Sequence, residues 1–409
     1  MTASDPAEIL ATLRAAVEGH AELPQGASAL RLRVRLQPAG GPGAKVMPPT
    51  YSGPQGPVYV TEDRVVDGEV LPCVSLDSVA SQANRLELAL SQEIEDGRVR
   101  IPTVWVDQAE FGVHSALDFS HRCFDAWVED ALLGETRFGD TDLWVDIAGA
   151  QRRSLGALMA RSPSAILFGC WASRVKNPQG SARLARILSS EIVAVGSHPG
   201  QRAASKIDIH PVSRGVDVYE AGEGQGRITL NPEHAAREKD KPKPFPGTQP
   251  GRPSSAGYGN VAPSVATHGG ISMRYGLQIA TVSLPALREC RFPDDGDRRV
   301  ERDVAGRLML AALALRLLAL QVERGYDLRS GCLLIPAEEP TVELLDRVGG
   351  VAATWALAEA PTQAVLAGAI DVGRGEGISW DGEEVSLKAS PAQLQLLRQS
   401  LVQAPAEES

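Results

Sequence analysis

The helical periodicity of residues 78–92 is the most informative hydrophobic pattern in the chain. Apolar side chains recur there every three to four residues, which predicts one buried helix face made of Val79, Ala83, Leu86 and Leu90. A polar stripe lies beside this face and consists of Ser78, Ser81, Gln82 and Arg85. Hydroxyl, amide and guanidinium groups suit hydrogen bonds to a phosphate–sugar backbone. An ordinary amphipathic helix with a polar shoulder is the alternative, and Asp77 is expected to cap the helix.

Period-two alternation marks a strand near the start of the chain. Over Leu30–Gln37, leucine or valine alternates with arginine, which predicts a strand with one solvated face. The remaining patterns predict a helix at Pro6–Glu18, strands at Val58–Val60, Glu69–Ser75 and Ser164–Ser173, a helix at Gly180–Leu188, a strand at Glu191–Val195, a strand or hairpin at Ile271–Leu284, a helix at Asp303–Glu323, a strand at Ser330–Pro336, and helices at residues 341–360 and 391–402.

The order of the core elements predicts the fold class. Without insertions, the elements follow one another as β-α-β-β-α-β, the ferredoxin-like plan that RNA-recognition domains share. We therefore expect an α+β protein in which an RRM-like palm spans residues 30–340, with a helical segment at 1–29 before it and a helical extension at 341–409 after it. Large insertions into the palm are expected at residues 38–70, 97–160 and 208–268. Many unrelated functions share this plan, so it does not identify the function by itself.

Two segments rich in glycine are expected to be loops. Pro38–Tyr51 is too rich in Gly and Pro for a helix or strand, and it carries Lys45 and Tyr51. Residues 221–268 are poor in apolar side chains and are expected to form a long loop. At its end, the segment Gly257–Arg274 carries Asn260, Ser264, Thr267 and His268 on a backbone that can approach a polyanion closely. A structural glycine-rich turn is the alternative there.

Composition describes a soluble globular protein and shows little sign of a metal or membrane site. The chain has 409 residues, of which 43% are hydrophobic and 22% charged. The five cysteines are scattered, so neither a zinc site nor a disulfide framework is indicated. The longest apolar run is interrupted by Arg316, so we expect no membrane span. These features favour a cytoplasmic protein without a metal or cofactor.

The charge is strongly segregated along the chain. The formal net charge is −10, yet residues 151–215 contain ten Lys and Arg against two acids, a local net charge of +8. Residues 101–150 contain ten acids against two arginines. Such segregation is typical of a basic groove on an acidic body, and chance fluctuation of charge is the alternative.

A catalytic centre finds weak support in the sequence. An Asp–His couple can be read at His121, which lies between Asp118 and Asp125, but neither Cys123 nor Cys170 lies in a recognisable nucleophile motif. We therefore favour a helix cap there.

Two further groups of residues are also given structural interpretations. A surface pair of His121 and Arg122 is expected, and the acids of residues 107–146 have no spacing specific for a metal, so solvated acidic surface is the default. Trp171 lies in an apolar run and is expected in the core rather than on a base-stacking surface.

Seven segments carry a resemblance to a known family: GGPGAKVMPPTY (40–51), VSLDSVASQANRLELAL (74–90), SPSAILFGCWAS (162–173), SARLARILSSEIVAVG (181–196), SKIDIHP (205–211), GNVAPSVATHGGISM (259–273) and DLRSGCLL (327–334). Together they resemble the repeated backbone subunit of type I-U (also called I-G) CRISPR interference complexes, or Cascade. That subunit belongs to the RAMP superfamily. The resemblance implies a hand-shaped protein in which fingers and a thumb are inserted into the RRM-like palm.

The resemblance also implies partners. Copies of the subunit would stack along one CRISPR RNA (crRNA) and hold its spacer open for pairing with a target DNA strand. Further partners would be the large subunit, the crRNA-processing and capping subunit, and the helicase-nuclease. No catalytic residue is implied.

The resemblance further implies which residues bind RNA. They are Ser78, Ser81, Gln82 and Arg85 on the helix, Lys45 and Tyr51 in the loop, the basic residues Arg174, Arg183, Arg186 and Lys206, and Asn260, Ser264 and His268 in the glycine-rich segment. Gln82 and Arg85 are the favoured contacts, because a cap by Asp77 would satisfy the helix N–H groups that could otherwise bind phosphate.

Three functional hypotheses therefore stand at this point. The first is a non-catalytic RNA-binding filament subunit that grips backbone while guide–target pairing reads sequence. The second is a metal-dependent nuclease that uses His121 or acids near residues 107–146. The third is a self-assembling structural protein without nucleic acid.

Overall fold

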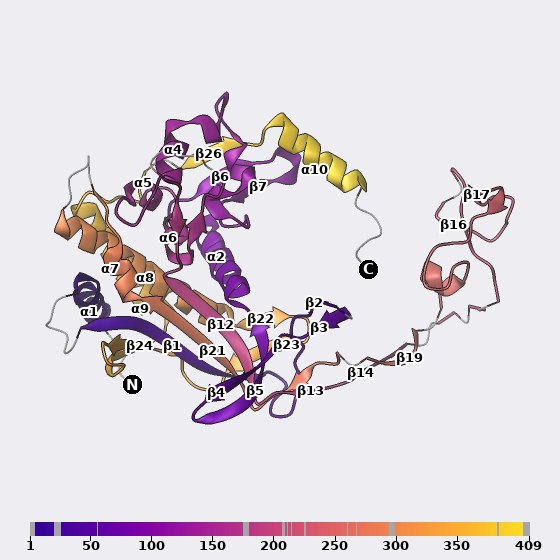
Figure 1. Cartoon of the computed structure of the whole chain (residues 1–409), viewed down its shortest axis with the longest axis horizontal. Coiled ribbons are helices and arrows are strands. Elements are labelled where there is room, and N and C mark those ends of the chain that lie inside the picture. Colours follow the sequence, from indigo (N-terminus) through magenta and orange to yellow (C-terminus); the bar gives the residue numbers. More distant parts are fainter. Residues whose placement is uncertain are drawn as a thin grey trace. The chain divides into compact units, whose positions relative to one another are not determined.

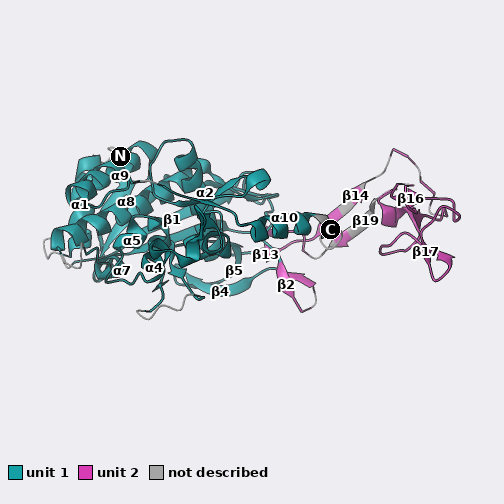
Figure 2. Cartoon of the chain, turned by 90° about the horizontal axis from the view of Figure 1, so that it is seen from above, with its two compact units in different colours: residues 1–50, 59–197, 273–409 teal, residues 51–58, 198–272 magenta. Residues whose placement is uncertain are grey.

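The computed structural model describes residues 5–19, 26–54, 56–174, 180–206, 209–210, 212–213, 215–224, 226–259, 261–266, 268–293, 299–382 and 384–403. The chain divides into two compact units (Figure 2). The first contains Met1–Thr50, Tyr59–Ser197 and Met273–Ser409, and the second contains Tyr51–Val58 and His198–Ser272. The second unit overlaps the insertions expected at residues 38–70 and 208–268.

A curved antiparallel sheet, a half-barrel, is the centre of the first unit (Figure 1). Its strand order is β22-β23-β1-β21-β12-β5-β4, and the hairpin β24-β25 pairs with β1 beside this path. The strands are β1 (Ala27–Pro38), β4 (Thr61–Val66), β5 (Glu69–Asp77), β12 (Leu188–Val195), β21 (Tyr275–Ser283), β22 (Tyr326–Arg329), β23 (Cys332–Pro336), β24 (Thr341–Asp346) and β25 (Val351–Ala356). The expected α+β class is therefore confirmed.

Strand β1 shows how the hydrophobic pattern orients the sheet. Leu30, Leu32, Val34 and Leu36 are all buried, whereas the intervening arginines lie on the other face. Successive side chains of a strand point to opposite faces, so this alternation fixes which face of β1 packs on the core. The arginine face is neutralised locally, because Arg31 pairs with Glu343 at 2.8 Å and Arg35 with Asp67 at 3.2 Å.

Helices cover the buried face of the sheet (Figure 1). They are α1 (Pro6–Glu18), α2 (Val79–Glu95), α7 (Leu284–Glu289), α8 (Val300–Arg324) and α9 (Glu359–Gly375). α8 is the central one, since it packs against α1, α2, α7 and α9 and every residue from Arg302 to Gln321 is buried. In the described part of the chain, no helix is long and apolar enough to cross a membrane.

A buried arginine joins three of these helices. Arg316 of α8 is 2% exposed, and its guanidinium lies 2.7 Å from Glu93 of α2, 3.2 Å from Glu359 of α9 and 3.5 Å from Glu323 of α8. Burial raises the pKa of Glu323 to about 7; the carboxylates of Glu359 and Glu93 also raise it, and Arg316 opposes them. One cation thus balances several carboxylates in the helical layer.

A smaller mixed sheet also belongs to the first unit. Its strand order is β7-β6-β26-β8-β9, with β26 parallel to β6. The strands are β6 (Val104–Asp107), β7 (Val113–Ser115), β8 (Leu132–Leu133), β9 (Thr136–Arg137) and β26 (Val385–Lys388). The helices that follow or connect them are α3 (Ala126–Glu129), α4 (Asp142–Ala148), α5 (Gly156–Met159), α6 (Pro163–Phe168) and α10 (Pro391–Gln403).

The second unit consists of short antiparallel pairs. The longest is β14 (Arg202–Lys206) with β19 (Val261–Ala266), so part of the segment expected to be a loop forms a strand. The other pairs are β2 (Tyr51–Gly53) with β3 (Gly56–Val58), β13 (His198–Pro199) with β20 (Ile271–Ser272), β15 (Tyr219–Glu220) with β16 (Ile228–Thr229), and β17 (Arg237–Glu238) with β18 (Lys241–Pro242).

Three predicted elements have the wrong secondary structure, and the strand expected at Val58–Val60 overlaps only the last residue of β3. The strand expected at Ser164–Ser173 is mostly helix α6, followed by the two-residue strand β10 (Cys170–Trp171), because Pro163 begins a helix and an apolar run alone does not distinguish helix from strand. The helix expected at Gly180–Leu188 is extended, and its strand β11 (Arg183–Leu184) pairs with β10. The helix expected at residues 341–360 is the hairpin β24-β25, in which Val342 and Leu344 alternate with less buried side chains.

Candidate nucleic-acid interface

Asp77 organises the polar stripe of α2. Its side chain is fully buried and accepts four hydrogen bonds, two on each oxygen. Oδ1 accepts from Ser81 Oγ at 2.7 Å and Arg329 Nη2 at 3.2 Å, and Oδ2 accepts from Gln82 Nε2 at 2.6 Å and Arg85 Nε at 2.9 Å. The buried carboxylate therefore links three residues of the polar stripe, Ser81, Gln82 and Arg85.

The predicted cap at Asp77 is wrong by one residue. Ser78 is the N-cap, and its hydroxyl accepts from the backbone N–H of Ser81 at 3.2 Å. Asp77 ends β5, and its carboxylate is used by side chains of α2 and by Arg329. The sequence does not tell which of two adjacent residues with capping side chains is the N-cap. In the structure β5 continues through Asp77, so the cap falls on Ser78.

Gln82 lies in the core and does not face solvent. It is 0% exposed, and its amide oxygen accepts from Ser190 Oγ at 2.8 Å and from Gln278 Nε2 at 3.2 Å. Gln278 in turn accepts from the Tyr326 hydroxyl at 2.7 Å, and burial raises the pKa of that tyrosine. This residue, favoured in the sequence as an RNA contact, instead joins α2 to β12 and β21.

Arg85 links α2 to β22. Besides its bond to Asp77, it donates Nη1 to the carbonyl of Asp327 at 3.4 Å and Nη2 to that of Leu328. Its side chain is 30% exposed. Nε, Nη1 and Nη2 of Arg85 therefore all donate hydrogen bonds within the protein. These bonds attach α2 to β22 and leave the guanidinium partly exposed.

Arg329 is a member of this cluster that the sequence reasoning missed. Its side chain is 25% exposed, and its Nη1 has no hydrogen-bond partner among the described residues. Arg329 lies in the segment DLRSGCLL, two residues before a glycine turn. The local sequence does not indicate that this arginine contacts Asp77, which lies 252 residues away in the chain.

The loop with Lys45 packs beside the cluster. Met47 N–H donates to the carbonyl of Gly331 at 2.9 Å, and Ala39 N–H donates to that of Leu333 at 3.0 Å. Gly331 has φ +77°, and a Cβ there would lie 2.8 Å from the Met47 side chain, so only glycine permits this approach. Lys45 is exposed on the loop. We call three segments together the α2 edge: residues 77–85, which contain the end of β5, the N-cap and the start of α2, residues 39–47, and residues 327–331.

The predicted basic residues divide between partners. Arg186 is exposed and donates to the Val79 carbonyl at 3.1 Å, which places it at the α2 edge. Burial and the neighbouring Arg122 lower the pKa of Arg186. The Arg183 guanidinium lies 5.3 Å from the centre of the Trp171 ring, whereas Arg174 lies 3.5 Å from Glu129. The +8 stretch is therefore several local sites.

The structure arranges the residues around His121 for packing. Asp125 caps α3 through Trp127 N–H at 3.1 Å, as the preferred interpretation predicted. The expected surface His121–Arg122 pair is wrong, because Arg122 pairs with the buried Glu87 through two bonds, one of 2.9 Å. Burial raises the pKa of Glu87, and Arg122 opposes this effect.

Of the candidate nucleophiles, Cys123 is buried and Cys170 is partly buried. Burial raises the pKa of the Cys170 thiol to about 12 and that of Cys123 as well, so both are protonated near neutral pH. No group of three His, Cys, Asp or Glu side chains suited to a metal ion occurs within the described ranges. Several of the acids instead pair with arginines, as Arg137 does with Glu129, Asp130 and Asp140.

The other predicted RNA contacts belong to the second unit. Tyr51 is 40% exposed on β2, and His268 is exposed. Lys206 pairs with Val261, and Ser264 with Ala204, in the β14–β19 ladder. Asn260 and Thr267 lie outside the described residues.

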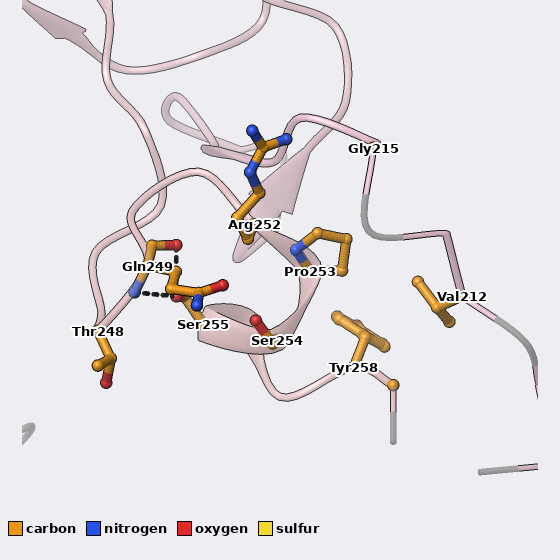
Figure 3. A pocket seen from close by; sticks show the side chains of 10 residues that line it. Val212, Gly215, Thr248, Gln249, Arg252, Pro253, Ser254, Ser255 and Tyr258 are labelled. Atoms are coloured by element: carbon orange, nitrogen blue, oxygen red, sulfur yellow. Dashed lines mark hydrogen bonds between the residues drawn. The ribbon is translucent and has the colours of Figure 1, made fainter. Parts of the chain in front are cut away.

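The second unit also contains a pocket of about 770 Å³ (Figure 3). Its lining includes Gln249, Arg252, Ser255 and Tyr258, and Ser255 Oγ donates to the Gln249 carbonyl at 2.7 Å. No acid or histidine occurs among the described residues that line it, and Arg252 pairs with Asp217 at 3.3 Å. These described lining residues therefore offer no acid–base pair for hydrolysis.

Comparison with known protein families finds a match in the N-terminal half of the chain. Residues 30–199 match the family model described as CRISPR-associated protein GSU0053 (Cas_GSU0053). The matched region begins in β1 and includes α2, Trp171 and β12. No curated protein matches the chain significantly.

Proposed function

We propose that this chain, whose residues 30–199 match the model of the Cas_GSU0053 family of CRISPR-associated proteins, is a non-catalytic RNA-binding backbone subunit of a CRISPR effector complex. A role in CRISPR defence follows from the family. The backbone role, in which repeated copies hold one crRNA for pairing with a target DNA strand, is our proposal.

The observation that carries the proposal is the strand order of the main sheet. In chain order, β1, α2, β12, β21, α8 and β23 form a β-α-β-β-α-β series, and the sheet places these strands antiparallel in the order β23-β1-β21-β12. The fourth strand lies beside the first, and the third lies between the first and the second. This arrangement supports an RRM-like palm of the RAMP type, because RNA-recognition domains use the same plan.

The α2 edge supports RNA as the ligand. It combines the guanidinium groups of Arg85 and Arg329 with the buried carboxylate of Asp77. Asp327 adds one exposed acid, and Lys45 and Arg186 add two exposed cations. Such an excess of fixed cations suits contacts to phosphate, which position a nucleic acid without reading its sequence. We assign Lys45 and Arg186 as contacts and Asp77 and Gln82 as the buried support that holds α2 in place.

Further partners follow from the same proposal. They are additional copies of the chain, the large subunit, the crRNA-processing and capping subunit, and the helicase-nuclease of the complex, all in the cytoplasm. The second unit, to which Tyr51, Lys206, Ser264 and His268 belong, would then supply thumb contacts to the RNA.

RNA titration at several salt concentrations tests the proposal. Purified protein should bind labelled single-stranded RNAs of unrelated sequence with similar affinity, and the logarithm of the association constant should fall linearly with the logarithm of salt concentration. Strong preference for one sequence, or no binding at low salt, would refute the proposal. Protein purified from its native host should also have an absorbance ratio at 260 and 280 nm that indicates bound nucleic acid.

The nuclease hypothesis is separated by a cleavage assay. Labelled RNA incubated with the protein and Mg²⁺ or Mn²⁺ should remain intact. Metal-dependent cutting that is abolished by one acid-to-amide substitution in residues 107–146 would favour the nuclease instead.

A further inference from the structure

Trp171 is exposed, contrary to the expectation that it lies in the core. Its side chain is 60% exposed, although tryptophan is usually largely buried. It lies on β10 directly opposite Arg183 of β11, and the Arg183 guanidinium lies 5.3 Å from the centre of its ring. A cation at this distance over an indole is held by the negative face of the ring. The two side chains therefore form a preassembled surface pair.

The backbone under this pair is fixed at several points. Gly169 ends α6 with φ +77°, and a Cβ at this position would lie 2.8 Å from the Leu184 carbonyl oxygen. Ala172 N–H donates to the Ala182 carbonyl at 2.9 Å, and Ile187 N–H donates to the Leu167 carbonyl at 2.8 Å. Because both strands are anchored on either side, the ring is presented without an ordering cost for the backbone.

The charge around the pair favours an anionic ligand. Residues 151–190 contain seven Lys and Arg and no Asp or Glu. Arg186 follows Arg183 by three residues, which span at most about 11 Å, and it contacts the first turn of α2 through the Val79 carbonyl. The Trp171–Arg183 pair therefore lies close along the chain to Arg186, which is assigned to phosphate binding.

We propose that the Trp171–Arg183 pair stacks an unpaired base of bound RNA, while Arg186 neutralises an adjoining phosphate. This inference rests on the proposed RNA-binding function and adds a specific base contact to it. Every base has a π face, so stacking on an indole or a guanidinium plane tolerates any sequence, as a guide-holding subunit requires. An apolar protein segment is the competing occupant, but such a segment would gain nothing from the surrounding positive charge.

The test compares two oligonucleotide probes by fluorescence anisotropy at fixed salt. One is a labelled single-stranded RNA, and the other has the same length and phosphates but carries abasic sites. Trp171→Ala should weaken binding of the first probe about 5- to 150-fold, which corresponds to about 1–3 kcal/mol for one stacked base. Binding of the abasic probe should not change, and Trp171→Phe should retain most of the affinity for RNA.

The salt dependence adds a second readout. Trp171→Ala should leave the slope with salt unchanged, whereas Arg186→Ala should reduce it, because Arg186 is the residue assigned to the phosphate. Equal affinity of wild type and Trp171→Ala for RNA overturns the stacking site and leaves the proposed function standing. An equal loss for both probes also overturns it, since the effect would then be structural. If the wild type binds neither probe, the proposed function fails as well.

Discussion

The Asp77 carboxylate accepts a 2.6 Å hydrogen bond from the Gln82 amide, and both side chains are buried. This bond connects the end of β5 to a helix, and the other Gln82 contacts extend the connection to Ser190 and Gln278. A stripe that resembles a ligand-binding surface in the sequence is therefore, in its deeper half, part of the core.

Replacing Asp77 should destabilise the first unit. In Asp77→Asn, the two guanidinium groups lose their shared counterion and one oxygen acceptor is lost. Breaking a buried ion pair costs about 3–5 kcal/mol. Urea denaturation should show a loss of this size, whereas Asp63→Asn, which changes an exposed acid on β4, should stay within about 0.5 kcal/mol of wild type. A loss below about 1 kcal/mol for Asp77→Asn would contradict the role of the carboxylate as organiser.

The exposed cations of the α2 edge should act on RNA rather than on stability. Removing Lys45 and Arg186 together should weaken RNA binding and lower the slope with salt by about 1.4, since each single-strand phosphate contact contributes about 0.7. The melting temperature should barely change. The matched control is the double variant Lys388→Ala with Arg100→Ala, which removes two exposed cations outside the α2 edge. Arg100 matches Arg186 because each donates one hydrogen bond to a backbone carbonyl. An equal effect of both double variants would refute the α2 edge as the site.

Stability should depend on pH through Glu323. Its folded pKa, about 7, lies above its ordinary value of 4.5, so between these values the folded state binds more protons than the unfolded state. The contribution is fully present below about pH 4.5 and is lost as pH rises through about 7. Glu323→Gln should therefore be more stable than wild type at pH 8 and similar to it at pH 5.

Thermal melts of both proteins at the two pH values measure this difference. Glu339→Gln, which changes an exposed acid, should differ from wild type by the same small amount at both. A Glu323→Gln variant that is less stable than wild type at pH 8 would show that its negative charge is needed by Arg316.

Gly169 should tolerate no side chain. In Gly169→Ala, the new methyl group would overlap the Leu184 carbonyl, and the positive φ would add strain. We expect a loss of about 1–3 kcal/mol, with a shift in tryptophan fluorescence as β10 and β11 separate. Gly97→Ala also has a positive φ, but a Cβ there meets open space, so it controls for backbone strain alone. Equal losses in the two variants would show that the close approach is unimportant.

The sequence predicted those elements in which a single period dominates. Strand β1 was predicted because burial on one face produces an alternating sequence pattern. Helix α8 was predicted because burial on every side produces a long apolar run. The elements around Trp171 were not predicted, since Pro163, Gly169 and pairing with Arg183 decide them, and pairing between distant segments leaves no local period.

The sequence predicted which polar residues belong to the candidate site, but it did not predict which of them are buried. Polar residues at helical spacing were correctly placed on one side of α2, but the spacing does not tell which of them face solvent and which face a neighbouring strand. Gln82 is buried because β12 and β21 supply polar partners at Ser190 and Gln278. Those partners lie more than 100 residues away in the chain, so only the fold reveals them.

The parallel pairing of β26 with β6 has a consequence for synthesis on the ribosome. Lys388 pairs with Asp107, so β6 must wait for about 280 further residues before its neighbour exists. At roughly 5–20 residues per second this delay is roughly 14–56 s. During that time one edge of β6 is open to other chains, and neighbouring nascent copies or a chaperone would reach it before β26 does.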